Sequence, residues 1–514
     1  MKTSLRHIGS IVFLCSVVIL SLFVIQSSIP LIQAAQFDRF ADAVLGQPEF
    51  TSSLENNSGL SAASLNYPWG LAVDQQTGRL YIADTSNHRV LGWPSAAAFT
   101  NQEAADLVIG QSDFTSNSSD QGQPLPNAAT LDGPIDVAVD YDGNLYVADF
   151  DNHRILVYED PTEHDAVADW VLGQPSFFDE FAGAGRDGLH FPWGMAIDSA
   201  GNLYVADSEN NRVLQYDTPL TTDTLPDQVF GQPNFESTTR NNGGVSAVSL
   251  SGSLDLALDW LGNLYVADTG NGRVLIYRDP LNTDTTADEV IGQPNFTSNA
   301  VSDPGPDTFS WLTGITVDRY GNVYTVEISR DRVMVFETLL YSDKIADRVL
   351  GQPDFTTVED RDRETNAATL LEPIGVAVDT GNNIVVADMS NSRVLRYDTV
   401  GPHPIPEITE VTPATIPVGS ANLMLTVTGQ NFASDTVLFW DDMPLETTVV
   451  DYTEVTATID AAYLREAGTA NLTIRNPAPG GQQSAPWLIT IGSATTPTPS
   501  PSSTPTVFLP AIIR

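Results

Sequence analysis

One sequence pattern recurs six times in this chain and constrains its fold more than any other feature. Each copy has an apolar run ending in Asp, a Gly-Asn turn, a run close to Leu-Tyr-Val-Ala-Asp, a short polar link and a run close to Arg-Val-Leu. A second tag, close to Val-Leu-Gly-Gln-Pro-x-Phe, also occurs six times, with its glycine at Gly46, Gly110, Gly173, Gly231, Gly292 and Gly351. The period of about 60 residues predicts one supersecondary unit per copy.

Each copy contains four short strand candidates. In the second copy they are residues 135–140, 144–149, 154–158 and 170–173, separated by Asp-Gly-Asn, Asp-Asn and Pro turn signals. Four strands repeated six times predict an all-β, six-bladed β-propeller. The first tag precedes any innermost strand, and the sixth copy lacks a tag after it. We therefore expect the N-terminal tag to supply the outer strand of the last blade and to close the ring.

The repeat covers only part of the chain. We expect a signal peptide over 1–35, because Lys2 and Arg6 precede the apolar run Ile8–Ile25 and the pair Ala34-Ala35. An uncleaved membrane anchor is the alternative. The propeller is predicted over 36–400, a Pro-rich linker over 401–406, an immunoglobulin-like β-sandwich over 407–492, and a Thr/Pro/Ser-rich stalk with a short apolar tail over 493–514.

The composition favours an exported protein. The formal net charge is −42, and Lys2 and Lys344 are the only lysines, so the surface should repel nucleic acid and anionic lipid. The only cysteine, Cys15, lies inside the expected signal, so the mature chain would form no internal disulfide. A large cystine-free exported fold is more typical of bacteria, and the chain is expected to be secreted or held at the cell surface, with membrane or cell-wall association through its termini.

The repeat resembles the NHL repeat, with Asn87-His88-Arg89-Val90 and Asn152-His153-Arg154-Ile155 close to its signature. The segment from Leu425 to Phe432, with Asn476-Pro477 and Gly480-Gly481, resembles the IPT/TIG immunoglobulin-like domain. Acidic and arginine residues keep their registers in the repeats and are interpreted as structural clamps: Asp84/Arg89, Asp149/Arg154, Asp207/Arg212, Asp268/Arg273, Glu327/Arg332 and Asp388/Arg393.

Four residues near the expected channel are candidates for ligand binding. Where other copies have glycine, four positions before the Asp that ends the innermost strand, the second and fourth copies have Asp136 and Asp255. With backbone carbonyls and water, these carboxylates are candidate ligands for Ca²⁺, the only cofactor suggested, whereas the alternative is turn capping or exposure to solvent. Trp69 and Trp193 are candidates for an aromatic ligand-binding lip, or for packing beneath the loops.

These features favour a non-catalytic extracellular or cell-surface binding protein. Long links between blades predict a loop-rich face that binds a protein, peptide or glycan ligand. The alternative is a calcium-dependent hydrolase resembling propeller lactonases, and a purely structural envelope component is a third reading. The resemblance to amidating lyases would require three converging histidines, but only His88 and His153 share a register. NHL-like proteins include both binding proteins and enzymes, so the resemblance does not choose between them.

Overall fold

The computed structural model describes residues 39–492 except 338, 340–342, 359–363, 400–404, 433–435, 452 and 477–482. The expected signal peptide, most of the linker, and the stalk and tail lie outside the described residues. Within the described part of the chain, no helix is long and apolar enough to cross a membrane.

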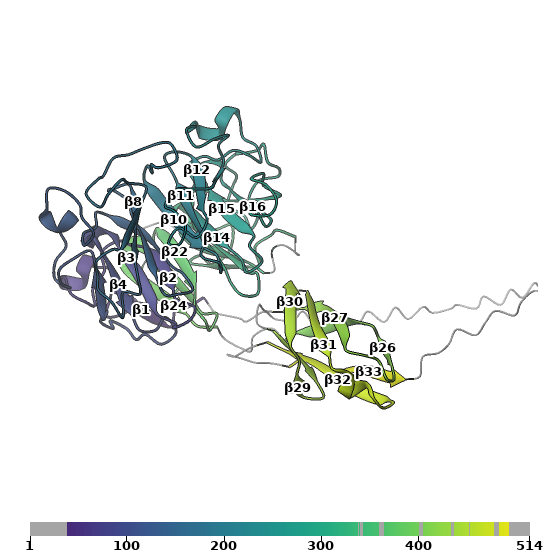
Figure 1. Cartoon of the computed structure of the whole chain (residues 1–514). Helices are drawn as coiled ribbons and strands as arrows, with labels where there is room; N and C mark the ends of the chain where they lie inside the picture. Colours follow the sequence, from purple (N-terminus) through teal and green to yellow (C-terminus); the bar gives the residue numbers. More distant parts are fainter. Residues whose placement is uncertain are drawn as a thin grey trace, which may run out of the picture. The chain divides into compact units, whose positions relative to one another are not determined.

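Six four-stranded antiparallel sheets form the blades of a propeller, as predicted (Figure 1). The innermost strands are β2 (Pro68–Val73), β6 (Pro134–Val139), β10 (Pro192–Ile197), β14 (Asp255–Leu258), β18 (Leu312–Val317) and β22 (Pro373–Val378). The second strands are β3 (Leu80–Asp84), β7 (Leu145–Asp149), β11 (Leu203–Asp207), β15 (Leu264–Asp268), β19 (Val323–Glu327) and β23 (Ile384–Asp388).

The third and fourth strands complete each blade. The third strands are β4 (Arg89–Trp93), β8 (Arg154–Tyr158), β12 (Arg212–Tyr216), β16 (Arg273–Tyr277), β20 (Arg332–Phe336) and β24 (Arg393–Tyr397). The outer strands are β5 (Leu107–Ile109), β9 (Trp170–Leu172), β13 (Gln228–Phe230), β17 (Glu289–Ile291), β21 (Arg348–Leu350) and, for the sixth blade, β1 (Ala43–Leu45). We number the blades by their innermost strands in chain order.

The second and third strands of each blade are buried at every position, because a neighbouring blade covers each face of the sheet. In β3, Tyr81 and Ala83 pack with blade 2, whereas Leu80 and Ile82 pack with blade 6. Alternate side chains of one strand therefore enter two different cores, and the six inter-blade cores form a closed ring.

The ring is closed by the N-terminal strand, which confirms the prediction. Strand β1 pairs antiparallel with β24, with Val44 opposite Leu395. The backbone N–H of Asp398 also donates to the Asp42 carboxylate, 356 positions away in the chain. The first and last propeller strands therefore share one sheet, which removes two exposed sheet edges.

Two kinds of link meet at one face of the propeller. The long links join an outer strand to the next innermost strand and comprise residues 46–67, 110–133, 173–191, 231–254, 292–311 and 351–372. The short links join the second and third strands; in blades 1 and 4 they contain the 3-10 turns η2 (Thr85–Asn87) and η5 (Thr269–Asn271). Backbone bonds such as Ser86 N–H to the Asn66 carbonyl and Gly270 N–H to the Ser251 carbonyl join the two kinds of link.

The C-terminal domain is a β-sandwich of two sheets. One sheet has the order β25-β27-β31-β30 and the other β26-β33-β32-β28-β29. The strands are β25 (Glu407–Thr412), β26 (Thr415–Pro417), β27 (Leu423–Gln430), β28 (Val437–Trp440), β29 (Met443–Pro444), β30 (Thr447–Asp451), β31 (Glu454–Ile459), β32 (Gly468–Arg475) and β33 (Trp487–Gly492). Inward-facing residues such as Leu425, Val427 and Leu472 form its core, as alternation along each strand requires.

The closing strand should contribute strongly to stability. Leu45 is fully buried in β1, so Leu45→Ala should lower the free energy of unfolding by about 2–5 kcal/mol through lost burial and the cavity left behind. The matched control is Leu54→Ala, because Leu54 is 62% exposed, and its effect should stay within about 0.5 kcal/mol. Guanidinium unfolding of both variants measures the difference, and equal effects would contradict closure by β1.

Candidate functional site

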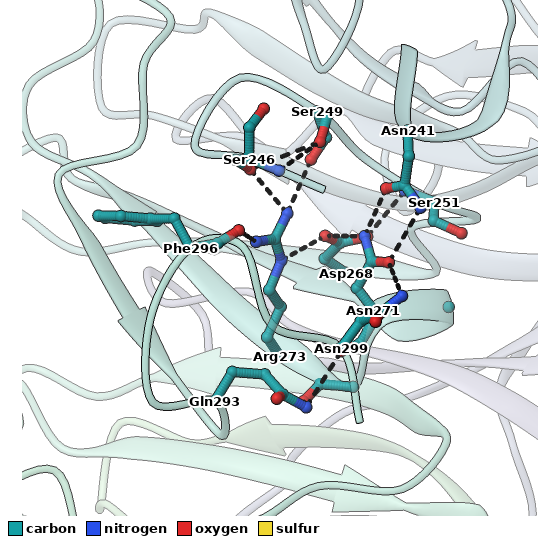
Figure 2. A network of polar contacts seen from close by, with 12 residues as sticks. Asn241, Ser246, Ser249, Ser251, Asp268, Asn271, Arg273, Gln293, Phe296 and Asn299 are labelled. Atoms are coloured by element: carbon teal, nitrogen blue, oxygen red, sulfur yellow. Dashed lines mark hydrogen bonds and ion pairs between the residues drawn. The ribbon is translucent and has the colours of Figure 1, made fainter. Parts of the chain in front are cut away.

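Each blade contains a buried ion pair that ties its strands to the links. In blade 4, Arg273 Nε lies 2.7 Å from Asp268 Oδ2, and both side chains are fully buried (Figure 2). The same carboxylate accepts a bond of 2.8 Å from the Asn271 amide and another of 2.8 Å from the Ser251 N–H. The carboxylate therefore joins the second strand, the short link and the preceding long link.

The remaining guanidinium N–H groups hold the long links. Arg273 donates through Nη2 to the carbonyls of Ser246 and Ser249, both at 2.9 Å, and through Nη1 to the carbonyl of Phe296 (Figure 2). Phe296 belongs to the tag that begins the following long link. One arginine thus fixes two successive links, which suits the planar fork of the guanidinium group.

The same arrangement occurs in all six blades. The ion pairs are Asp84–Arg89, Asp149–Arg154, Asp207–Arg212, Asp268–Arg273, Glu327–Arg332 and Asp388–Arg393. Their side chains are fully buried. Burial raises the pKa of Asp149 to about 6, although Arg154 opposes this change. Arg393 donates to the carbonyl of Phe50 in the first tag, so this network also crosses the ring closure.

The fifth blade carries a second buried arginine. Glu327 replaces the usual Asp, and Arg330 occupies the position where blade 4 has Asn271. Arg330 contacts Glu327 at 3.2 Å and donates to the carbonyls of Ser302 at 2.7 Å and Thr308 at 2.9 Å. The link 292–311 therefore accepts bonds from two arginines of blade 5, Arg330 and Arg332, in addition to Arg273 of blade 4.

The glutamine of each tag is a structural residue that sequence reasoning did not single out. Gln111 Nε2 donates to the carbonyls of His88 and Ser118, and Gln174 Nε2 donates to those of His153 and Phe181. Gln47, Gln232, Gln293 and Gln352 also donate to short-link carbonyls. The recurrence of Gly-Gln in all six tags is the sequence feature that could have indicated this structural role.

The central channel contains a cavity of about 210 Å³ lined by the innermost strands of all six blades. Asp136, Asp255, Trp69 and Trp193 all line it, so the structure places the four predicted ligand-binding residues at one cavity.

The two channel carboxylates bind neighbouring blades. Asp136 Oδ2 accepts the Met195 N–H of blade 3, and Asp255 Oδ2 accepts the Ile315 N–H of blade 5, both at 2.8 Å. Neither residue is a turn cap, which was one sequence-based alternative. Glycine is required opposite Asp136, because a Cβ on Gly70 would lie 2.5 Å from the Asp136 Cα.

Both carboxyl groups are easier to protonate than usual. Burial raises the pKa of Asp255 to about 7. Burial, followed by the charge of Asp255, raises the pKa of Asp136 well above its ordinary range. Among the described residues, no group of three or more His, Cys, Asp or Glu side chains is placed to hold a metal ion.

The two tryptophans contact one another. The Trp69 and Trp193 rings lie 5.1 Å apart between centroids, and Phe150 meets Trp193 edge-on at 5.3 Å. Both rings also pack against inter-blade cores. The pair therefore packs against the inter-blade cores and also lines the channel cavity, and its role in binding a ligand stays a prediction.

Each short-link histidine bonds the next blade. His88 Nδ1 accepts the Gly133 N–H at 3.0 Å, and His153 Nδ1 accepts the Phe191 N–H at 3.2 Å. Burial and the neighbouring His190 lower the pKa of His153 to about 4, so its ring is neutral at pH 7. The two histidines thus occupy equivalent positions that join adjacent blades.

Every long link exposes at least one large apolar side chain. We call this set the apolar ring: Leu54, Leu125, Phe178, Phe181, Val248, Val301, Trp311 and Val358. The length of the links predicted a loop-rich binding face. These residues could not be identified from the sequence, because exposure depends on how each link folds back on the blades.

Comparison with known families assigns the repeats and the second domain. The NHL repeat family matches residues 65–93, 131–158, 189–216, 254–277 and 370–397. The IPT/TIG domain family matches residues 406–491. The chain contains NHL repeats and an IPT/TIG domain. The matched NHL segments lie in blades 1, 2, 3, 4 and 6, whereas blade 5 carries Glu327 and Arg330 in its altered clamp.

Curated relatives match part of the chain. Teneurin-3 of Danio rerio is 28% identical over 247 residues, which cover 44% of this chain and 8% of teneurin-3. The chloroplastic protein SUPPRESSOR OF QUENCHING 1 of Arabidopsis thaliana is 23% identical over 219 residues, covering 41% of this chain and 19% of that protein. The match thus covers less than a fifth of either relative's length.

Two solved propeller structures are distantly similar to this chain. A streptogramin B lyase has a TM-score of 0.39 and 11% identity, with 68% of this chain and 97% of that chain covered. A gluconolactonase from Xanthomonas campestris has a TM-score of 0.37 and 14% identity, with coverage of 71% and 99%. At these scores the likenesses carry no functional assignment.

Breaking one clamp should destabilise the NHL propeller. Asp149→Ala leaves Arg154 buried without its carboxylate, so the free energy of unfolding should fall by about 3–5 kcal/mol. Asp106→Ala is the matched control, because the Asp106 side chain, paired with Arg79, is 47% exposed and its loss should cost about 0–1 kcal/mol. Denaturant unfolding measures both variants. Equal losses would show that the buried pair contributes no more than a surface pair.

The channel carboxyls should make stability fall as the pH rises. The folded pKa of Asp255, about 7, exceeds its ordinary value of 3.8, so the folded state binds this proton more tightly than the unfolded chain. The resulting stabilisation is complete below pH 4 and is lost as the pH approaches and passes 7. Asp255→Asn should therefore raise stability at pH 8 by roughly 1 kcal/mol or more, with a smaller effect at pH 4.

Thermal unfolding from pH 4 to pH 8, with and without calcium, measures this effect. Asp142→Asn, at an exposed position, should leave the pH profile unchanged. If Asp255→Asn destabilises the protein at pH 8 specifically when calcium is present, the carboxylate binds the metal and the expected gain is wrong.

Proposed function

We propose that this protein is a non-catalytic extracellular or cell-surface binding protein that uses the loop-rich face of its NHL propeller. The ligand class is a protein, peptide or glycan. The predicted N-terminal signal would export the chain, and the IPT/TIG domain and stalk would present the propeller at the cell surface or in the medium.

The apolar ring carries this proposal. Its members come from all six long links, and several are as exposed as Leu54 at 62%. Large apolar side chains left in water on all six long links favour the face that carries these links as an interaction surface. The ring lies on the links that the buried arginines hold, so a ligand would meet side chains on a preorganised backbone.

Preorganisation lowers the entropic cost of binding. The long links receive bonds from buried guanidinium and glutamine groups, as Arg154 and Gln174 show by donating to the carbonyls of Asn127, Thr130 and Phe181. A link already fixed in the free protein loses less conformational freedom when it binds. Links that are fixed in this way support the proposal that the loop-rich face binds a ligand.

The polar groups of the channel and of the short links support a structural role. Asp136, Asp255, His88 and His153 each accept a backbone N–H from the next blade. A general base must instead direct its lone pair at a substrate proton. The competing proposal, a calcium-dependent hydrolase, draws on the two carboxylates that line the channel cavity.

The proposal is tested with purified full-length chain on panels of extracellular proteins and immobilised glycans. We expect specific binding that weakens at least tenfold in a four-site variant of the ring, Leu54→Ser, Leu125→Ser, Phe181→Ser and Val248→Ser. A control variant changes exposed apolar residues outside the long links, Tyr141→Ser, Val167→Ser and Ile345→Ser, and should bind normally.

Two outcomes would contradict the proposal. Equal binding by the ring variant and the control variant would remove the loop-rich face as the binding surface. Calcium-dependent hydrolysis of a lactone panel, lost in Asp136→Asn, would favour the enzyme instead.

A further inference from the structure

The backbone is left-handed at one equivalent position of every blade, near the end of the long link that leads to the innermost strand. Its φ angle is close to +50° in every blade: Tyr67 (52°), Gly133 (58°), Phe191 (53°), Gly252 (55°), Trp311 (51°) and Glu372 (49°). Glycine adopts this conformation freely, whereas a bulky side chain is strained in it. Blades 2 and 4 have the glycine that this geometry favours.

Packing compensates for the strain at two of the aromatic positions. Tyr67 packs against the core between blades 1 and 6, and Phe191 stacks on Phe150 with ring centroids 4.5 Å apart. Trp311 differs, because 63% of its surface is exposed to solvent. In the free protein, Trp311 therefore has a strained backbone conformation, and burial of its side chain does not compensate for that strain.

The segment before Trp311 is held firmly. The Ser310 N–H donates to the Glu327 carboxylate, and the Ser329 hydroxyl donates to the Ser310 carbonyl at 2.8 Å. Arg330 and Arg332 both donate to the Thr308 carbonyl. Blade 5 thus adds a second arginine to the same link that presents the exposed tryptophan.

The surroundings of Trp311 on this link indicate the kind of partner. Val301, on the same link, is 80% exposed, and Asp303 and Asp307 on that link are also exposed. The whole chain has a formal net charge of −42. An exposed apolar anchor on a link that also carries exposed carboxylates complements an apolar pocket bordered by lysine or arginine.

We propose that Trp311 is the anchor of a protein-docking surface on blade 5, and that its partner is a protein with an apolar pocket rimmed by basic residues. This inference rests on the proposed binding function and names its partner class. Exposed, rigidly presented tryptophans are typical centres of protein interfaces. Burial of Trp311 in the complex would compensate for the strain that the free protein carries.

The test separates binding from stability. In the full-length chain, Trp311→Gly should raise the melting temperature, because glycine relieves the left-handed strain. The same variant should weaken binding of a labelled amphipathic leucine/lysine peptide at least tenfold, as measured by fluorescence anisotropy at physiological salt. Trp311→Phe should keep binding within about threefold.

Two controls locate the effect. Tyr141→Ala removes an aromatic residue of similar exposure, 66%, from outside the long links and should leave peptide binding unchanged. A matched leucine/glutamate peptide should not bind, since its charges oppose those of the chain.

Several results would overturn the inference. A lower melting temperature in Trp311→Gly would show that the side chain already stabilises the free protein. Unchanged peptide binding in Trp311→Gly would reject the anchor. The partner class would be rejected if the basic peptide does not bind the parent chain, or if a glycan binds through Trp311 and the peptide does not. Loss of panel binding in the four-site ring variant, but not in Trp311→Gly, would keep the proposed function and reject the anchor.

Discussion

The buried arginine fork is the interaction on which this propeller depends. A guanidinium group removed from water is costly unless all of its N–H groups find acceptors. Arg154 comes close to this requirement, because one carboxylate and three carbonyls accept four of its five N–H groups. Because those carbonyls belong to two long links, satisfying the arginine also fixes the surface of the molecule. Core stability and the shape of the loop-rich face therefore have the same origin.

The arrangement of the blades can be predicted from the sequence because each of the six copies repeats the same strand and turn pattern. The period of the tag, the Asp and Arg registers and the unpaired tag at the N-terminus together predicted six blades and the pairing of β1 with β24. Short strands with turn signals likewise predicted the sandwich. These features depend on local spacing and on the need to pair sheet edges, both of which can be read along the chain.

The candidate site was harder to predict because its properties arise between blades. Asp136 and Asp255 were recognised as departures from glycine, but their bonds to Met195 and Ile315 come from neighbouring blades. Trp311 was not singled out, since its strain follows from a backbone angle and its exposure from the path of a link. An alignment of the copies does hold a clue: Gly133 and Gly252 occupy the equivalent positions, which indicates a left-handed residue there.

The pairing of β1 with β24 also imposes an order on assembly. During synthesis, Asp42 emerges long before Asp398, whose N–H it accepts in the finished ring. Until then blade 6 lacks its outer strand, and the nascent chain is an open arc with two unpaired edges, a state prone to aggregation. The shortness of β1, only three residues, leaves little edge for another chain to pair with during this interval.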